Sequence, residues 1–177
     1  MNITLLFGIS VALSFLAWGA FSVRYIWPWL SRTGLPEAAK PLLILHAFRF
    51  VGLVFLVPGV VSASLPPGFA LPAAYGDLVA ALLAWVAMFA LGKPYERLAL
   101  WTFNVWGALD LMFAFFQGLI GVGIAPSALG AAFFIPTVIV PLLLITHAMI
   151  FVLLLRVAPL ASTGGRGKAH GNRIPGF

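Results

Sequence analysis

The sequence predicts an all-α integral membrane protein, folded as a bundle of five transmembrane helices. Of the 177 residues, 63% are hydrophobic and only 8% are charged, whereas soluble domains carry about 25% charged residues. Five apolar segments are long enough to cross a hydrocarbon layer of about 30 Å. The basic residues lie at segment ends that face one side of a five-span chain. These three observations exclude a soluble globular domain.

The five predicted spans cover residues 3–23, 41–63, 75–91, 99–120 and 133–155. Each contains a run of apolar residues about the length of a membrane-crossing helix. The intervening segments contain glycine, proline or charged residues, which are typical of connections between helices. We therefore expect one membrane domain over residues 1–157 and a basic, disordered cytoplasmic tail over residues 158–177.

Prolines and one carboxylate indicate how these spans begin, end and bend. Pro28 follows the first span, where a residue without an N–H ends a helix at little cost. Pro41 is expected in the first turn of the second span. Asp77 lies close to the start of the third, where a carboxylate caps a helix and complements its dipole. Pro141 is expected to kink the fifth span.

The orientation follows from the distribution of lysine and arginine. In a five-span chain, nine basic residues fall on one side: Arg24, Arg32, Lys40, Lys93, Arg97, Arg156, Arg166, Lys168 and Arg173. The predicted loops on the other side, residues 64–74 and 121–132, contain neither lysine nor arginine. The positive-inside rule then predicts an N-terminus outside and a C-terminus in the cytoplasm. We expect a multi-pass protein of the inner or plasma membrane.

A few polar side chains lie inside the predicted spans, and they predict a buried site. Counted from the nearest basic boundary at about 1.5 Å per residue, Arg49 and His147 both lie about 13 Å deep, and Asp110 lies about 19 Å deep. His46 and Asn104 lie about one helical turn nearer the cytoplasm. Ionisable groups within spans are candidate functional residues, because they are costly unless they are paired. We therefore expect these five side chains to face one another.

Three classes of function are compatible with this site. The first is a site that binds or translocates a small solute, an ion or a proton, formed by His46, Arg49, Asn104, Asp110 and His147. The second is an accessory or assembly subunit in which Arg49 and Asp110 form a purely structural ion pair. The third is a redox protein that binds quinone or b-type haem, with His46 and His147 as haem ligands.

Other classes find little support in the residues. The chain has no cysteine, which excludes disulfides and thiolate metal sites. No hydrolase, zinc-protease or nucleotide-binding motif is present, so an enzyme is not the favoured reading, although Asp110 and His147 could serve as an intramembrane acid–base pair. The net charge of +6 comes from lysines and arginines that lie mostly at the ends of the predicted spans. We therefore expect a lipid bilayer and not nucleic acid as the partner. A homodimer or a larger membrane complex also fits, and no metal is predicted.

Overall fold

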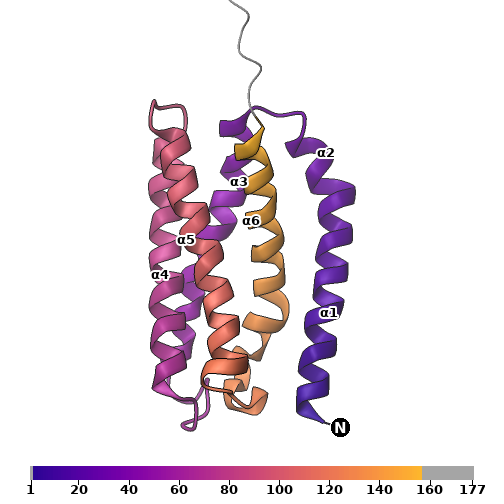
Figure 1. Ribbon diagram of the computed structural model, residues 1–177, viewed down its shortest axis with the longest axis vertical. Helices are drawn as coiled ribbons and strands as arrows, with labels where there is room; N and C mark the ends of the chain where they lie inside the picture. The colour runs from indigo at the N-terminus through magenta and orange to yellow at the C-terminus, as the bar shows by residue number, and fades with distance from the viewer. Residues whose placement is uncertain (1, 157–177) are drawn as a thin grey trace, which may run out of the picture.

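The computed structural model describes residues 2–156, and over this range the chain is mostly helical (Figure 1). Five helical segments are long and apolar enough to cross a membrane: Ile3–Leu30, Leu35–Leu56, Pro67–Ala90, Glu96–Gly121 and Ile135–Leu155. The predicted fold class is confirmed to this extent. The proposed tail, residues 158–177, lies outside the described residues.

Several of these segments combine α-helix with tighter or wider turns. The first consists of α1 (Ile3–Phe21), a π-helical stretch η1 (Ser22–Ile26) and α2 (Trp27–Leu30). The second is α3 (Leu35–Ala47) followed by the 3₁₀-helix η2 (Phe48–Leu56), and the third is α4 (Pro67–Ala90). The fourth is α5 (Glu96–Phe116) with the π-helical η3 (Gln117–Gly121). After the 3₁₀ stretch η4 (Pro126–Phe133), the last comprises the π-helical η5 (Ile135–Ile139) and α6 (Val140–Leu155).

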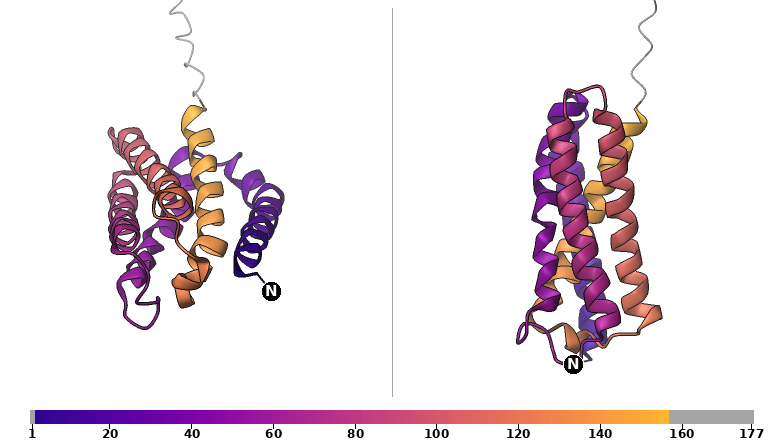
Figure 2. Two further views of the ribbon diagram at one scale, coloured as in Figure 1. Left: turned by 60° about the horizontal axis from the view of Figure 1, so that its bottom comes forward. Right: turned by 90° about the vertical axis from the view of Figure 1, so that its left-hand side faces the viewer.

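Successive segments run in opposite directions, and α4 lies at the edge of the bundle opposite α1 (Figures 1 and 2). It packs against η2 and α3 on one side and against α5 on the other. In Figures 1 and 2, α3, α4, α5 and α6 form a compact group, and α1 stands at its edge beside α6. No residue of α1 is buried, so the core lies within the group of four.

Alanine explains how α4 can approach two neighbours. Its buried face includes Ala73, Ala80, Ala84 and Ala87, which follow the helical spacing of three or four residues. Small side chains allow neighbouring helix backbones to come close together. Asp77 lies on the same buried face, between Ala73 and Ala80, so the close packing brings its carboxylate into the core.

Two predicted boundaries in the first half of the chain are wrong. The first helix does not stop before Pro28, and the second does not start at Pro41. The first helical segment continues through Pro28 to Leu30. In the π-helical stretch that precedes Pro28, the Trp27 N–H bonds to the Ser22 carbonyl five residues earlier, so the change of register occurs just before the proline. The second segment begins at Leu35, not at residue 41. Pro36 lies in its first turn, and Pro41 lies inside the helix.

The third boundary has the largest consequence. Helix α4 begins at Pro67, eight residues before the predicted start at residue 75. Pro67 suits a first turn, and Pro72 lies inside the helix. Because Pro72 has no N–H for the Gly68 carbonyl, that oxygen receives the Gln117 side-chain amide instead, at 3.5 Å. Asp77 is therefore an interior residue and not a helix cap, and the prediction of a cap is wrong.

The last two segments agree better with their predicted ranges. The segments Glu96–Gly121 and Ile135–Leu155 lie close to the predicted 99–120 and 133–155. The irregularity expected at Pro141 precedes it, as the π-helical η5 in which the Val140 N–H bonds to the Ile135 carbonyl. The Trp18 indole N–H donates to the Val138 carbonyl at 3.1 Å, which ties α1 to this irregular stretch.

The two ends of the bundle differ in charge. The connections after α2 and α4 and the end of α6 lie at one end, shown at the top of Figure 1, and carry Arg32, Lys93 and Arg156. The connections over residues 57–66 and 122–134 lie at the other end and contain neither lysine nor arginine. At the basic end, Arg156 donates to the Ser31 carbonyl at 3.1 Å, and its guanidinium lies 4.7 Å from the centroid of the Trp27 ring.

Candidate functional site

The side chain of Arg49 is the centre of the polar cluster. It lies in η2 and is only 2% exposed. Its Nε and Nη2 both lie 2.8 Å from Oδ1 of Asp77, and Nη2 lies 2.6 Å from Oδ2 of Asp110. Its Nη1 lies 3.0 Å from the Gly107 carbonyl and 3.3 Å from Nε2 of His147. A guanidinium has five N–H donors; four of these contacts are hydrogen bonds, and the contact of Nη2 with Asp77 is an ion pair.

The two carboxylates come from different helices. Asp77 belongs to α4 and Asp110 to α5, so Arg49 links three segments through ion pairs. We call Arg49, Asp77, Asp110 and His147 the arginine centre. Sequence reasoning paired Arg49 with Asp110 but missed Asp77. The sequence signal for Asp77 is its position three or four residues from alanines on either side, which places it on the alanine face of the helix. This pattern is complete only when the third helix begins at Pro67.

His147 is neutral in this arrangement, as its hydrogen bonds indicate. The Asn104 amide nitrogen donates to the His147 carbonyl at 3.2 Å, which directs Oδ1 of Asn104 to Nδ1 of the ring at 2.7 Å. An amide oxygen only accepts, so Nδ1 carries the proton. Nε2 is then free to accept from Arg49. Asn104 thus orients the ring and selects its tautomer.

His46 lies beside His147, with their ring centroids 4.1 Å apart. The Thr146 hydroxyl donates to the carbonyls of Leu142 and Leu143, so its oxygen accepts from Nε2 of His46 at 3.0 Å. Nδ1 of His46 is buried without a hydrogen-bond partner among the described residues. The structure therefore brings together all five residues named from the sequence. Their role as a ligand or proton site stays a prediction.

Three glycines make room for the charged side chains. A Cβ at Gly107 would lie 2.8 Å from Nη1 of Arg49 and 2.7 Å from Nε2 of His147. A Cβ at Gly76 would collide with the carboxylate of Asp110, and one at Gly52 would lie 2.7 Å from Cβ of Asp77. Each glycine lies on a different segment of the bundle. The arginine centre therefore depends on close approach of bare backbone at three points.

The histidine pair does not fit a haem held between two imidazoles. Such a haem needs one nitrogen of each ring directed at the iron from opposite sides of the porphyrin. Here the rings of His46 and His147 are in contact, and their Nε2 atoms bond to Thr146 and Arg49. Among residues 2–156, no group of three or more histidine, cysteine, aspartate or glutamate side chains is arranged to hold a metal. Quinone binding remains an untested prediction.

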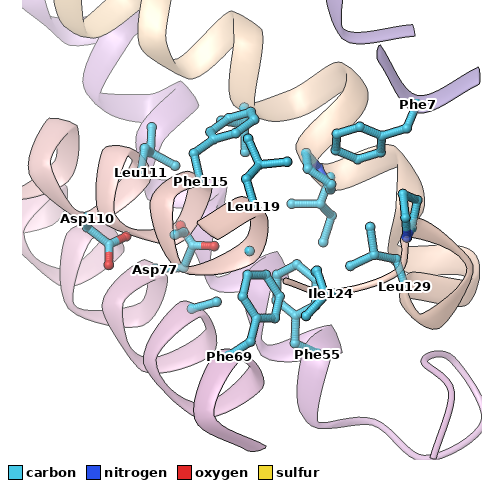
Figure 3. Close-up of a pocket in the computed structure, with 17 residues that line it drawn as sticks. Phe7, Phe55, Phe69, Asp77, Asp110, Leu111, Phe115, Leu119, Ile124 and Leu129 are labelled. Carbon is cyan, nitrogen blue, oxygen red and sulfur yellow. The ribbon is translucent and has the colours of Figure 1, made fainter. Parts of the chain in front are cut away.

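A mostly apolar pocket extends from the two carboxylates toward the end of the bundle without basic residues (Figure 3). It has about 650 Å³ of empty space, including the part open to the surroundings. Asp77 and Asp110 are its charged lining residues, and Phe7, Phe55 and Phe69 lie farther from Asp110 in the view of Figure 3. We call this the phenylalanine pocket. Its lining comes from α1, η2, α4, α5 and the stretch from η3 to the first residue of α6.

A second cavity reaches the same centre from another side. It lies between η2 and the η5–α6 segment and is lined by apolar side chains together with Arg49 and Asp77. Asp77, Ile135 and Val140 line both cavities. Asp77 therefore lies at the boundary between two spaces.

Residues 6–155 match a protein family described as a domain of unknown function, DUF8737, and the chain belongs to this family. No curated protein and no solved structure matches the chain significantly. The family description specifies no activity, so a function has to be argued from the arginine centre and its pocket.

Proposed function

We propose that this DUF8737 family member is an integral membrane protein that binds a small, mostly apolar molecule in the phenylalanine pocket, against the arginine centre. The observation that carries the proposal is the position of two carboxylates at one end of an otherwise apolar pocket. Small-molecule sites are typically apolar cavities with a few converging polar groups. A purely structural ion pair would be better isolated from open space than these two carboxylates are.

Two features support the membrane assignment and the orientation. The five helices expose large apolar side chains around the bundle, among them Leu16, Phe89, Leu109 and Ile120. Such a surface is suited to lipid and would be costly in water. The charge difference between the two ends favours the basic end in the cytoplasm. The pocket then opens toward the outer side, and the arginine centre lies within the membrane.

Single-cysteine labelling tests this orientation, because the chain has no cysteine of its own. Ala63→Cys lies in the connection without basic residues, and Tyr95→Cys lies in the connection between α4 and α5; both positions are exposed. In intact cells or spheroplasts, a membrane-impermeant maleimide should label residue 63 and not residue 95. After permeabilisation it should label both. The reverse pattern would contradict the proposed orientation.

Native mass spectrometry of the purified full chain tests binding in the pocket. We expect a small molecule to remain bound when the protein is released from mild detergent. Ala114→Phe should abolish its retention, because Ala114 lines the pocket and the added ring would fill it. Val105→Phe adds the same ring to an exposed position of the same helix and should retain the molecule. If wild type carries no small molecule, or if Ala114→Phe retains it, pocket binding is wrong.

A further inference from the structure

The arginine centre has no accessible hydrogen-bond donor for a ligand. Arg49 makes four hydrogen bonds and one further ion-pair contact within the protein, and its side chain is fully covered, at 0% exposure. His147 donates through Nδ1 to Asn104. An anion in the phenylalanine pocket would therefore meet neither an accessible cation nor an accessible donor.

The carboxylate oxygens of the same centre still have acceptor positions without a donor. The side chains of Asp77 and Asp110 are 11% and 12% exposed, and both line the pocket. Two ionised oxygens offer about four acceptor positions. Within the described part of the chain, Asp110 receives one hydrogen bond and Asp77 receives its contacts on Oδ1 alone. The polar end of the pocket therefore presents acceptors that still lack donors.

The charges of the centre are also unbalanced. One guanidinium faces two carboxylates, and His147 is neutral in its hydrogen-bonded form. With both carboxylates ionised, the centre has an excess of one negative charge. A buried charge without a partner is unfavourable, and a cation placed at the accessible oxygens would offset it.

The rest of the pocket suits an apolar body next to that cation. Phe7, Phe55, Phe69 and Phe115 contribute aromatic rings, and the other lining residues are mostly aliphatic side chains, glycine and proline. Aromatic faces also attract cations. Phe55 and Phe69 line the same pocket as Asp77 (Figure 3).

We propose that the occupant of the phenylalanine pocket is an amphiphilic amine, a molecule with an apolar body and one protonated nitrogen that donates to Asp110 and Asp77. This inference rests on the proposed function, because it specifies the class of molecule that the pocket binds. Ammonium is selected over a hydroxyl by its charge, and over a carboxylate by both its charge and its N–H donors.

Three probes with the same body test this selection: 3-phenylpropylamine, 3-phenylpropan-1-ol and 3-phenylpropanoate. Their binding to the full chain in nanodiscs of zwitterionic lipid is measured by titration calorimetry, with empty nanodiscs as the blank. We expect the amine to bind at least about ten-fold more tightly than the alcohol, since hydrogen bonds to charged groups are the stronger ones. The carboxylate should show no saturable binding.

Two sets of variants connect this preference to the centre. Asp110→Asn should bring the amine to within about two-fold of the alcohol, because an amide has no charge to offer. Leu119 lines the pocket but lies outside the centre, and it is 64% exposed. Leu119→Lys should weaken binding of the amine more than binding of the alcohol, because its charge repels the ammonium, whereas Leu119→Gln should leave the ratio of the two affinities as in wild type. The Leu119 pair also keeps the test valid if Asp110→Asn does not fold.

The outcomes separate this inference from the proposed function. Equal affinity of wild type for the amine and the alcohol, or tighter binding of the carboxylate, would overturn the selection of amines while pocket binding stands. If none of the three probes binds saturably, the amine assignment is also wrong. Failure of pocket binding itself is recognised separately, because native mass spectrometry then finds no molecule that depends on residue 114.

Discussion

Replacing Arg49 with methionine is expected to lower the free energy of unfolding by about 3–5 kcal/mol, because it leaves two buried carboxylates without their cation. The loss should be recovered to a large extent in the triple variant Arg49→Met, Asp77→Asn, Asp110→Asn, since the excess charge is then removed as well. Unfolding of the detergent-solubilised protein by sodium dodecyl sulfate, followed by tryptophan fluorescence, measures both effects.

Two further substitutions define the cause of this loss. Arg49→Lys keeps the charge but replaces a five-donor fork with one nitrogen, so we expect a stability between those of wild type and Arg49→Met. Arg32→Gln removes a positive charge from an exposed position and should change stability by no more than about 0.5 kcal/mol. If the triple variant is no more stable than Arg49→Met alone, unpaired carboxylates are not the reason for the loss.

Gly52→Ala should be strongly destabilising. Its Cβ would lie 2.7 Å from Cβ and 2.8 Å from Cγ of Asp77. These atoms are close to the α4 backbone and cannot rotate away, so η2 and α4 must separate. Overpacking of this kind costs about 1–3 kcal/mol, and displacement of Asp77 from Arg49 adds to that cost. Thermal unfolding in detergent should show a clear decrease in Tm.

Gly68→Ala provides the matched control on α4. Apart from its chain neighbours and its own helix backbone, no atom lies within 4 Å of the position of its Cβ. Replacing a helical glycine with alanine favours the helix by about 0.5–1 kcal/mol. The two substitutions should therefore change Tm in opposite directions, or Gly68→Ala should leave it unchanged. An unchanged Tm for Gly52→Ala would show that η2 and α4 are not as close as the structure has them.

The positions of the later helices and the meeting of Arg49, Asp110 and His147 could be predicted because both depend on counting. The predicted ranges 99–120 and 133–155 lie close to Glu96–Gly121 and Ile135–Leu155. Counting residues from basic boundaries gives similar depths for side chains on antiparallel helices. The structure agrees, with Arg49 bonded to both Asp110 and His147.

Asp77 could not be placed correctly from the sequence because of the prolines before it. A segment with Pro66, Pro67 and Pro72 predicts a loop, which places Asp77 near a helix start. In the folded protein Pro67 lies in the first turn, and the carbonyl left free by Pro72 is satisfied by Gln117 from another helix. A contact so distant in sequence is not visible in local residue patterns.

By itself, the sequence determined that the described chain forms five long apolar helices and that one end of the bundle is basic, because hydrophobic length and charge are properties of each segment alone. Only the tertiary structure decided that Arg49 binds two carboxylates, with Asp77 as the second, and that an apolar pocket ends at them. The physical reason is that these contacts depend on how the helices are rotated and on how closely Gly52, Gly76 and Gly107 let them approach.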